Sequence, residues 1–164
     1  ETAKSFGVRS RFVHFEFFRL LSDHEGLGKK GDLMALEVNM RPSGGFTPDM
    51  INFARETDVY KIWADMVAYD STQKPVGTHH FCAFAGLRDG KDFALTPDDI
   101  IEKYDDHLKM VERMPDALAD AMGNQMYLAT FDTEEELHTF FADVTRQKEP
   151  DVSVTSEAAE MVES

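Results

Sequence analysis

Residues 36–41 read Leu36-Glu37-Val38-Asn39-Met40-Arg41, with apolar and polar side chains on alternate positions. Successive side chains of a β-strand point to opposite faces, so Glu37, Asn39 and Arg41 would share one face. The apolar residues between them would anchor the strand in a core. The polar face would carry a carboxylate, a carboxamide and a guanidinium, groups that suit a divalent cation and a phosphate. This segment therefore predicts a magnesium-nucleotide site.

A second strand is predicted just before this one. Residues 11–20 are rich in aromatic side chains that alternate around Glu16, and a polar, glycine-containing connection leads to a strand over about 32–40. We expect an antiparallel hairpin with a long loop. In such a hairpin Glu16 and Glu37 can face the same side about 5–8 Å apart. Two carboxylates at that spacing repel each other unless a cation lies between them, and Mg²⁺ prefers hard oxygen ligands.

Two further residues complete this candidate site. Asn39 can add a neutral oxygen ligand without adding charge, and Arg41 can neutralise a phosphoryl group during transfer. The residue pattern alone also fits an ordinary exposed hairpin face on which Glu16, Glu37 and Arg41 form salt bridges, because mixed-charge faces are common in antiparallel sheets. Both interpretations stay open at the level of the pattern.

The rest of the chain predicts further helices and strands. Thr47 is expected to cap a helix that runs to about residue 70, with Pro48 in its first turn. Thr96 is expected to open a helix to about residue 113, which Pro115 ends. The other predicted elements are a strand over 78–88, a short helical turn over 116–122, a strand over 125–131 and a helix from Asp132 or Thr133 to about Arg146.

These elements predict an α+β fold in which an antiparallel sheet packs with helices. At 164 residues with 42% hydrophobic content, the chain can bury one core and can form two small subdomains. We expect a division into residues 1–75, residues 76–148 and an acidic tail over 149–164, which has too few large apolar groups to become ordered. Residues 1–7 resemble the last turns of a helix, so we also expect the chain to be a fragment.

The net charge of −14 is concentrated in the second half of the chain. Residues 1–95 hold 12 basic and 13 acidic side chains, whereas residues 96–164 hold 5 and 18. This excess of acid argues against nucleic-acid or membrane contact, because both need clustered Lys and Arg. No segment approaches the roughly 20 apolar residues of a membrane-spanning helix. The single cysteine, Cys82, is typical of a reducing compartment, so we expect a cytoplasmic location.

The histidines and the cysteine are less informative. His14 would share the face of Glu16 and could contact the site, but packing is its simpler interpretation because the sequence shows no partner for its ring. His79 and His80 would point to opposite faces of a strand and so could not bind one metal together. Cys82 lies among aromatic residues and is expected to be a buried small hydrophobe, not a nucleophile.

Several of these segments together resemble the carboxy-terminal half of an ATP-grasp domain. The motifs are Phe15-Glu16-Phe17-Phe18 and Leu36-Glu37-Val38-Asn39-Met40-Arg41-Pro42, followed by a glycine-rich loop and a helix. Residues 82–88, 96–104 and 123–131 also resemble the tail region of ATP-grasp proteins of the carboxylate–amine ligase type. The resemblance covers most of residues 1–147. It implies that residues 1–75 are the carboxy-terminal lobe of an ATP-grasp fold and that residues 76–148 are an extension packed on it.

The resemblance also implies a set of site residues. In this family the corresponding acids bind Mg²⁺ or Mn²⁺ on the phosphates of ATP, which assigns metal and nucleotide binding to Glu16 and Glu37, with help from Asn39. The catalytic residue would be Arg41, which would contact the transferred phosphoryl group or an acyl phosphate. The Ser43-Gly44-Gly45 loop would lie near the nucleotide and the substrate.

The implied reaction is attack of a substrate carboxylate on the γ-phosphate of ATP, followed by capture of the acyl phosphate by an amine or a thiol. The substrates would be small molecules, and a homo-oligomer is compatible with this assignment. The lysines and the glycine-rich loop that hold the phosphates in this family normally precede these strands and have no match here. We therefore expect the fragment alone to be inactive. The alternatives are a non-catalytic nucleotide- or carboxylate-binding module and a small acidic interaction domain.

Overall fold

The computed structural model describes residues 2–9, 11–72 and 77–148, and the predicted acidic tail over 149–164 lies outside the described residues. The chain is α+β, with antiparallel sheets and helices, as predicted. It divides into two compact units, residues 1–80 and residues 81–164. The sequence places this boundary a few residues earlier, after residue 75. In the described part of the chain, no helix is both long enough and apolar enough to cross a membrane.

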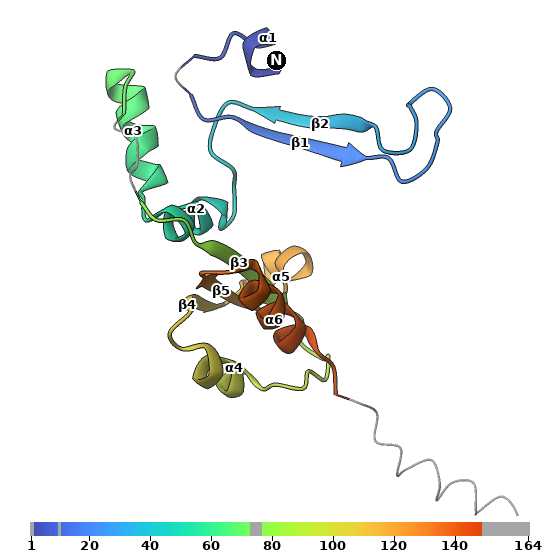
Figure 1. Ribbon diagram of the computed structural model, residues 1–164, viewed down its shortest axis with the longest axis vertical. Helices are drawn as coiled ribbons and strands as arrows, with labels where there is room; N and C mark the ends of the chain where they lie inside the picture. The colour runs from blue at the N-terminus through green and yellow to red at the C-terminus, as the bar shows by residue number, and fades with distance from the viewer. Residues whose placement is uncertain (1, 10, 73–76, 149–164) are drawn as a thin grey trace, which may run out of the picture. The chain divides into compact units, whose positions relative to one another are not determined.

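The first unit holds the predicted hairpin. Its elements are α1 (Thr2–Ser5), β1 (His14–Arg19), β2 (Leu33–Asn39), α2 (Thr47–Arg55) and α3 (Val59–Tyr69). β1 and β2 pair antiparallel as a two-stranded ribbon (Figure 1). Glu16 lies opposite Glu37, and the register then shifts so that Phe17 lies opposite Ala35. Leu36 is therefore the extra residue of a β-bulge.

The bulge changes the apolar face that the sequence predicts for β2. Leu36 is 56% exposed and Met40 is 38% exposed, so the expectation that both anchor the strand in a core is wrong. The reason is local. The bulge takes Leu36 out of the regular alternation of side chains, and Met40 follows Asn39, the last residue of the strand.

The single helix predicted from Thr47 to about residue 70 is two helices. α2 ends at Arg55 and is followed by Glu56, whose backbone is left-handed (φ 47°). Asp58 caps α3 by accepting a hydrogen bond from the Lys61 amide at 2.9 Å. The side chain of Asn52 also accepts from the Val59 amide at 2.7 Å. These short polar side chains satisfy backbone amides that a continuous helix would use, and so they favour the break. The residue that caps α2 is Phe46 and not Thr47.

The second unit is a three-stranded antiparallel sheet with helices. Its elements are β3 (Phe81–Leu87), α4 (Pro97–Tyr104), β4 (Leu108–Arg113), α5 (Asp116–Met122), β5 (Gln125–Phe131) and α6 (Glu134–Thr145). The strand order is β3-β5-β4, and β5 is antiparallel to both neighbours. β3 and β4 are thus parallel edge strands joined through α4, with β5 between them. This is a split βαβ arrangement.

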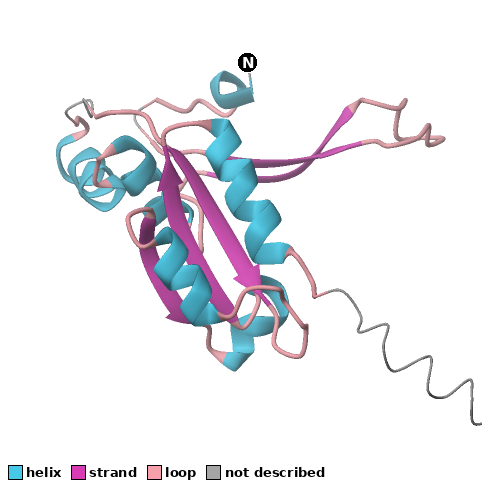
Figure 2. Ribbon diagram, turned by 60° about the horizontal axis from the view of Figure 1, so that its bottom comes forward, coloured by secondary structure: helices cyan, strands magenta, loops and turns pink. Residues whose placement is uncertain are grey.

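The main core lies between this sheet and helices α4 and α6, which cross one face of it (Figure 2). Tyr127, Ala129 and Phe131 of β5 point toward these helices and are buried. The helices contribute Ile100 and Tyr104 from α4, and Phe140 and Val144 from α6. The rings of Tyr104 and Phe140 meet edge to face at 5.0 Å. Each large buried side chain of this kind stabilises the fold by roughly 1.5–3 kcal/mol.

The opposite face of β5 is also buried, through Met126 and Leu128. The end of α5 lies close to this face, because a Cβ added to Gly86 would be only 1.8 Å from the Met122 carbonyl oxygen. Gly86 is the register partner of Met126. Only a residue without a side chain fits at this point of β3.

The predictions for the second unit are mostly confirmed. The capping roles of Thr96 and Thr133 are confirmed as complete capping boxes, and the predicted helical turn over 116–122 and strand over 125–131 match α5 and β5. The helix expected to reach residue 113 is wrong, because α4 ends at Tyr104 and β4 follows. Tyr104 fills the core and its hydroxyl donates to Asp143 at 2.7 Å, which fixes the end of the helix. The pairing with β5 then decides the conformation of β4.

Candidate functional site

The candidate site is one polar face of the β1–β2 hairpin. In the register of the two strands, His14 lies opposite Asn39 and Glu16 lies opposite Glu37. Side chains at alternate positions of a strand share a face, so these four residues project from the same side. The expectation that Glu16 and Glu37 face each other across the hairpin is confirmed. The bulge begins only after this pair.

Hydrogen bonds orient both carboxylates of this face. The Asn39 side-chain amide donates to Glu37 Oε1 at 2.5 Å. This contact uses the amide nitrogen of Asn39 and leaves its Oδ1 atom to act as an oxygen ligand. On the other strand, His14 Nε2 lies 3.1 Å from Glu16 Oε1. The sequence analysis places His14 on the face of Glu16 but favours packing for it, and the structure instead shows a contact with the Glu16 carboxylate.

The surroundings favour the ionised form of Glu37. The pKa of this carboxyl is lowered, mainly by the hydrogen bond from Asn39 and further by the hydrogen bond with Glu16 and by electrostatic interactions with His14 and Arg41. Glu37 is therefore a carboxylate at neutral pH. This is the form that binds a cation.

His14 has one ring nitrogen without a partner. Its Nδ1 atom is buried and has no hydrogen-bond partner within the described residues. If Nε2 carries the proton toward Glu16, Nδ1 is an acceptor that lacks a donor; we assign this tautomer from the geometry. Buried polar atoms usually have a hydrogen-bond partner, so this nitrogen is an unsatisfied acceptor on the hairpin face.

Arg41 lies beyond the end of β2. Its Nη1 donates to the Pro42 carbonyl at 2.9 Å, and its charge is close enough to Glu37 to lower the pKa of that carboxyl. The ion pairs among the described residues do not join Arg41 to Glu16 or Glu37. The alternative of a salt-bridged ladder through Arg41 is therefore not what this hairpin forms. The guanidinium remains a cation at the edge of the acidic face.

The Ser43-Gly44-Gly45 loop links β2 to α2. A Cβ added to Gly44 would meet no atom within 4 Å, so the backbone on this side is open. Gly45 has a left-handed backbone (φ 60°), which glycine adopts without strain. The loop can therefore present its backbone to a ligand, as the sequence predicts. It begins two residues after Arg41.

The donor set of this face suits a metal ion that is only partly held by protein. Among the residues that the structure describes, no three His, Cys, Asp or Glu side chains converge into a complete metal-binding group. Mg²⁺ is usually held by one or two carboxylates and completed by water and substrate phosphates. Glu16, Glu37 and the Oδ1 atom of Asn39 fit that partial set. They do not fit a closed structural site such as that of zinc.

Cys82 is not part of a reactive centre. It is half-buried on β3, and burial raises the pKa of its thiol to about 11. The thiol is therefore protonated at neutral pH and a poor nucleophile. This agrees with the interpretation of Cys82 as a small hydrophobe.

Comparison with known proteins adds no relative to this description. No protein-family model matches the sequence, and no curated protein matches it.

Proposed function

We propose that the chain is the carboxy-terminal half of an ATP-grasp domain with a carboxy-terminal extension, and that it belongs to an ATP- and Mg²⁺-dependent ligase of the carboxylate–amine type. Such an enzyme activates a carboxylate as an acyl phosphate and joins it to an amine or a thiol. The observation that carries the proposal is the direct pairing of Glu16 with Glu37, together with the hydrogen bond from Asn39 to Glu37.

The placement of two acidic side chains directly opposite each other requires a physical explanation. Like charges placed directly opposite each other destabilise an antiparallel pair of strands. The lowered pKa of Glu37 keeps this carboxylate ionised at neutral pH, where it can bind a cation. A cation between the two side chains would relieve repulsion between ionised carboxylates, and the oxygen ligands of this face favour Mg²⁺ or Mn²⁺.

Each residue then has a role that fits its position. Glu16, Glu37 and Asn39 would hold the metal ion, and His14 would fix the orientation of the Glu16 carboxylate through the contact at 3.1 Å. Magnesium, when bound with ATP, would neutralise charge on the phosphates. Arg41 would place its guanidinium against the phosphoryl group and the acyl phosphate, as a fork that recognises oxyanions. The backbone of residues 43–45 would approach the substrate.

The exposed apolar surface of the hairpin supports a missing partner lobe. Phe17 and Leu33 on one face of the ribbon are 45% and 58% exposed, and Phe18, on the same face as Glu16, is 60% exposed. A hairpin of this kind is marginally stable by itself, and apolar patches usually mark contact surfaces. In the proposal, this surface and the acidic face meet the nucleotide-binding half of the same enzyme. The 164-residue chain would then bind metal weakly and would not turn over ATP.

Metal binding by the chain itself tests the site. We expect Mn²⁺, followed by electron paramagnetic resonance in the presence of ATP, to bind the 164-residue chain and to bind Glu37→Gln at least about tenfold more weakly, because one of its two charged ligands is lost. Glu25→Gln removes the same charge from the exposed loop of the hairpin and is the matched control. Equal Mn²⁺ affinity of the Glu37 and Glu25 variants would contradict the proposal.

Turnover tests the proposed reaction. In a longer protein that contains this chain, Arg41→Ala and Glu37→Gln should each abolish ADP release that depends on a carboxylate substrate, whereas Arg19→Ala on the same hairpin should not. Unchanged turnover in the Arg41 variant would exclude the ligase mechanism. Metal-dependent nucleotide binding without turnover would instead identify a non-catalytic nucleotide-binding module.

A further inference from the structure

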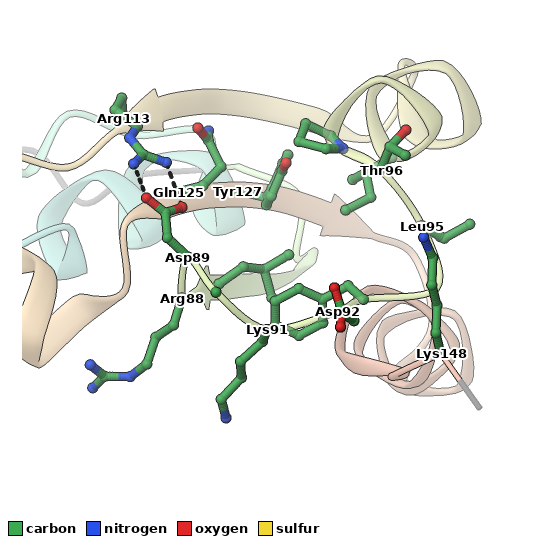
Figure 3. A pocket seen from close by; sticks show the side chains of 15 residues that line it. Arg88, Asp89, Lys91, Asp92, Leu95, Thr96, Arg113, Gln125, Tyr127 and Lys148 are labelled. Atoms are coloured by element: carbon green, nitrogen blue, oxygen red, sulfur yellow. Dashed lines mark hydrogen bonds and ion pairs between the residues drawn. The ribbon is translucent and has the colours of Figure 1, made fainter. Parts of the chain in front are cut away.

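The second unit contains a cavity that the hairpin site does not explain. It has a volume of about 410 Å³ and lies between the sheet and the connection from β3 to α4 (Figure 3). Its floor includes the buried side chains of Leu87, Ile100 and Tyr127, and Phe93 and Leu95 line its sides. Pockets for small ligands have volumes of about 300–1,000 Å³ and mostly apolar walls with few polar groups. This cavity has the size for a small molecule, and it combines an apolar floor with polar and charged side chains around it.

One polar group in the floor lacks a partner. Tyr127 is 0% exposed, and within the part of the chain that the structure describes its hydroxyl has no hydrogen-bond partner. The hydroxyl points toward the start of the helix that Thr96 caps (Figure 3). Burial raises the pKa of Tyr127, so this hydroxyl is protonated at neutral pH and can donate. A buried hydroxyl without a partner is unfavourable, and a ligand with an acceptor oxygen would satisfy it.

The charges around the cavity are unusual for this unit. Residues 81–148 contain seven Lys and Arg and fifteen Asp and Glu. Four of the seven basic residues line the cavity, but only two of the fifteen acids do. The basic residues are Arg88, Lys91, Arg113 and Lys148, and the acids are Asp89 and Asp92. The cavity therefore concentrates positive charge within an acidic unit, which favours an anion.

The contacts of these residues distinguish between a carboxylate and a phosphate as the bound anion. Arg113 is held by an ion pair with Asp89 (Figure 3), and Arg88 donates to the Asp120 carbonyl. Neither guanidinium is therefore available as a bidentate clamp for a phosphate group. Lys148 reaches along the rim toward Leu95, while Lys91 extends away from the cavity (Figure 3). One neutral donor in an apolar floor and one lysine at the rim suit a carboxylate better than a phosphate.

We propose that this cavity binds a small organic carboxylate with an apolar body. The body would pack against Leu87, Phe93 and Ile100, and an oxygen of the head group would accept the hydrogen bond from Tyr127. The ammonium group of Lys148 would provide the positive charge at the rim. This inference concerns the second unit alone, so it does not depend on the proposed ligase function or on the metal site of the hairpin.

Nuclear magnetic resonance of the whole ¹⁵N-labelled chain tests the proposal. The probes are isobutyrate, phenylacetate and indole-3-acetate, each compared with its neutral amide. We expect at least one carboxylate to give saturable shifts of the amides of Leu95 and Tyr127 with a dissociation constant below about 10 mM, and its amide to bind at least about fivefold more weakly.

Variants assign the contacts. Tyr127→Phe and Lys148→Met should each weaken binding of that carboxylate about fivefold or more, the usual effect of losing one hydrogen bond or charge contact. Lys109→Met, on the exposed side of β4 and outside the cavity, is the matched control and should bind as the wild type does. Tyr127→Phe removes only a hydroxyl without a partner, so the variant should fold, and its amide spectrum verifies this.

Three results would overturn the proposal. They are no saturable shift with any of the three carboxylates, equal affinity for a carboxylate and its amide, and unchanged affinity in Tyr127→Phe. The second result would exclude the role of charge, and the third would exclude the buried hydroxyl as the contact in the floor.

Discussion

The chemistry of Glu37 depends on a single neighbour more than on its place in the strand. The first cause of its low pKa is the hydrogen bond from Asn39, and electrostatic interactions with His14 and Arg41 contribute less. The folded-state pKa lies below the ordinary value. The ionised carboxylate therefore stabilises the fold at pH values above its ordinary pKa, and this contribution is lost as the pH falls through the folded-state pKa.

Asn39→Ala should raise the pKa of Glu37 toward its ordinary value, because the largest cause of the shift is removed. The titration of ¹³C-labelled Glu side chains by nuclear magnetic resonance measures this directly, and the other glutamates in the same spectra are internal controls. Asn52→Ala, on α2, is a matched variant that should leave the titration of Glu37 as it is. A Glu37 pKa that does not rise in Asn39→Ala would show that the hydrogen bond is not its cause.

Individual residues were predictable where strand alternation holds. The alternation of residues 36–41 predicts that Glu37 and Asn39 share a face, and the hairpin places Glu16 there too. The exposure of Leu36 could not be predicted, because the bulge depends on the register between two strands and not on β2 alone. The contact of His14 with Glu16 depends on a side-chain rotamer, which the sequence does not specify.

At the scale of elements, each capping box should stabilise its helix by a measurable free energy. Thr133 accepts from the Glu136 amide at 3.2 Å, and Glu136 accepts from the Thr133 amide at 3.1 Å. Thr133→Ala should therefore destabilise the chain by about 1 kcal/mol. Thr139→Ala, within the same helix, removes a hydroxyl that bonds only to the Glu135 carbonyl, and is the matched control. Urea unfolding measures both, and equal stability of the two variants would argue against the cap.

The contact of α5 with β3 should tolerate no side chain at Gly86. In Gly86→Ala the new Cβ would lie 1.8 Å from the Met122 carbonyl oxygen, so the strand or the helix must move. We expect a loss of about 3 kcal/mol or more in unfolding free energy, as for other overpacked positions. Gly44→Ala, where no atom lies within 4 Å, is the control and should change stability little. Thermal unfolding by circular dichroism compares them, and a small effect at Gly86 would refute this view of the contact.

Elements with strong local signals were predictable, and elements decided by pairing were not. The caps at Thr96 and Thr133 and the strand β5 are specified by residues within a few positions of each other. Residues 108–113 were predicted to continue a helix, but they form β4 because a distant strand, β5, offers them hydrogen-bond partners. The break between α2 and α3 depends similarly on a side chain, Asn52, that bonds seven residues ahead.

At the scale of the whole molecule, burial is concentrated in the second unit. Among the described residues, the buried apolar side chains lie almost entirely in residues 81–148, and Val59 is the exception among the large aliphatic and aromatic residues. The polar face of the hairpin could be predicted from local alternation. The cavity of the second unit could not, because its walls come from segments far apart in sequence and meet only after the sheet has formed.

Hydrogen exchange should reflect this difference. The amides of β5 pair on both sides and lie in the core, so they should exchange most slowly, whereas amides of β1 and β2 should exchange much faster. Exchange followed by mass spectrometry measures both in one experiment. Comparable protection of the hairpin and β5 would show that the exposed ribbon is held by more than its own strand pairing.

The position of β5 has a consequence for biosynthesis. The ribosome completes β3 and β4 before it makes the strand that separates and pairs with both. Until Phe131 has left the exit tunnel, the nascent chain carries two strands whose backbone groups have no sheet partner, and such edges promote association between chains. Translation that pauses before residue 125 would prolong this state. The second unit should therefore stop exposing unpaired strand edges to other chains only when β5 has been synthesised and has left the tunnel.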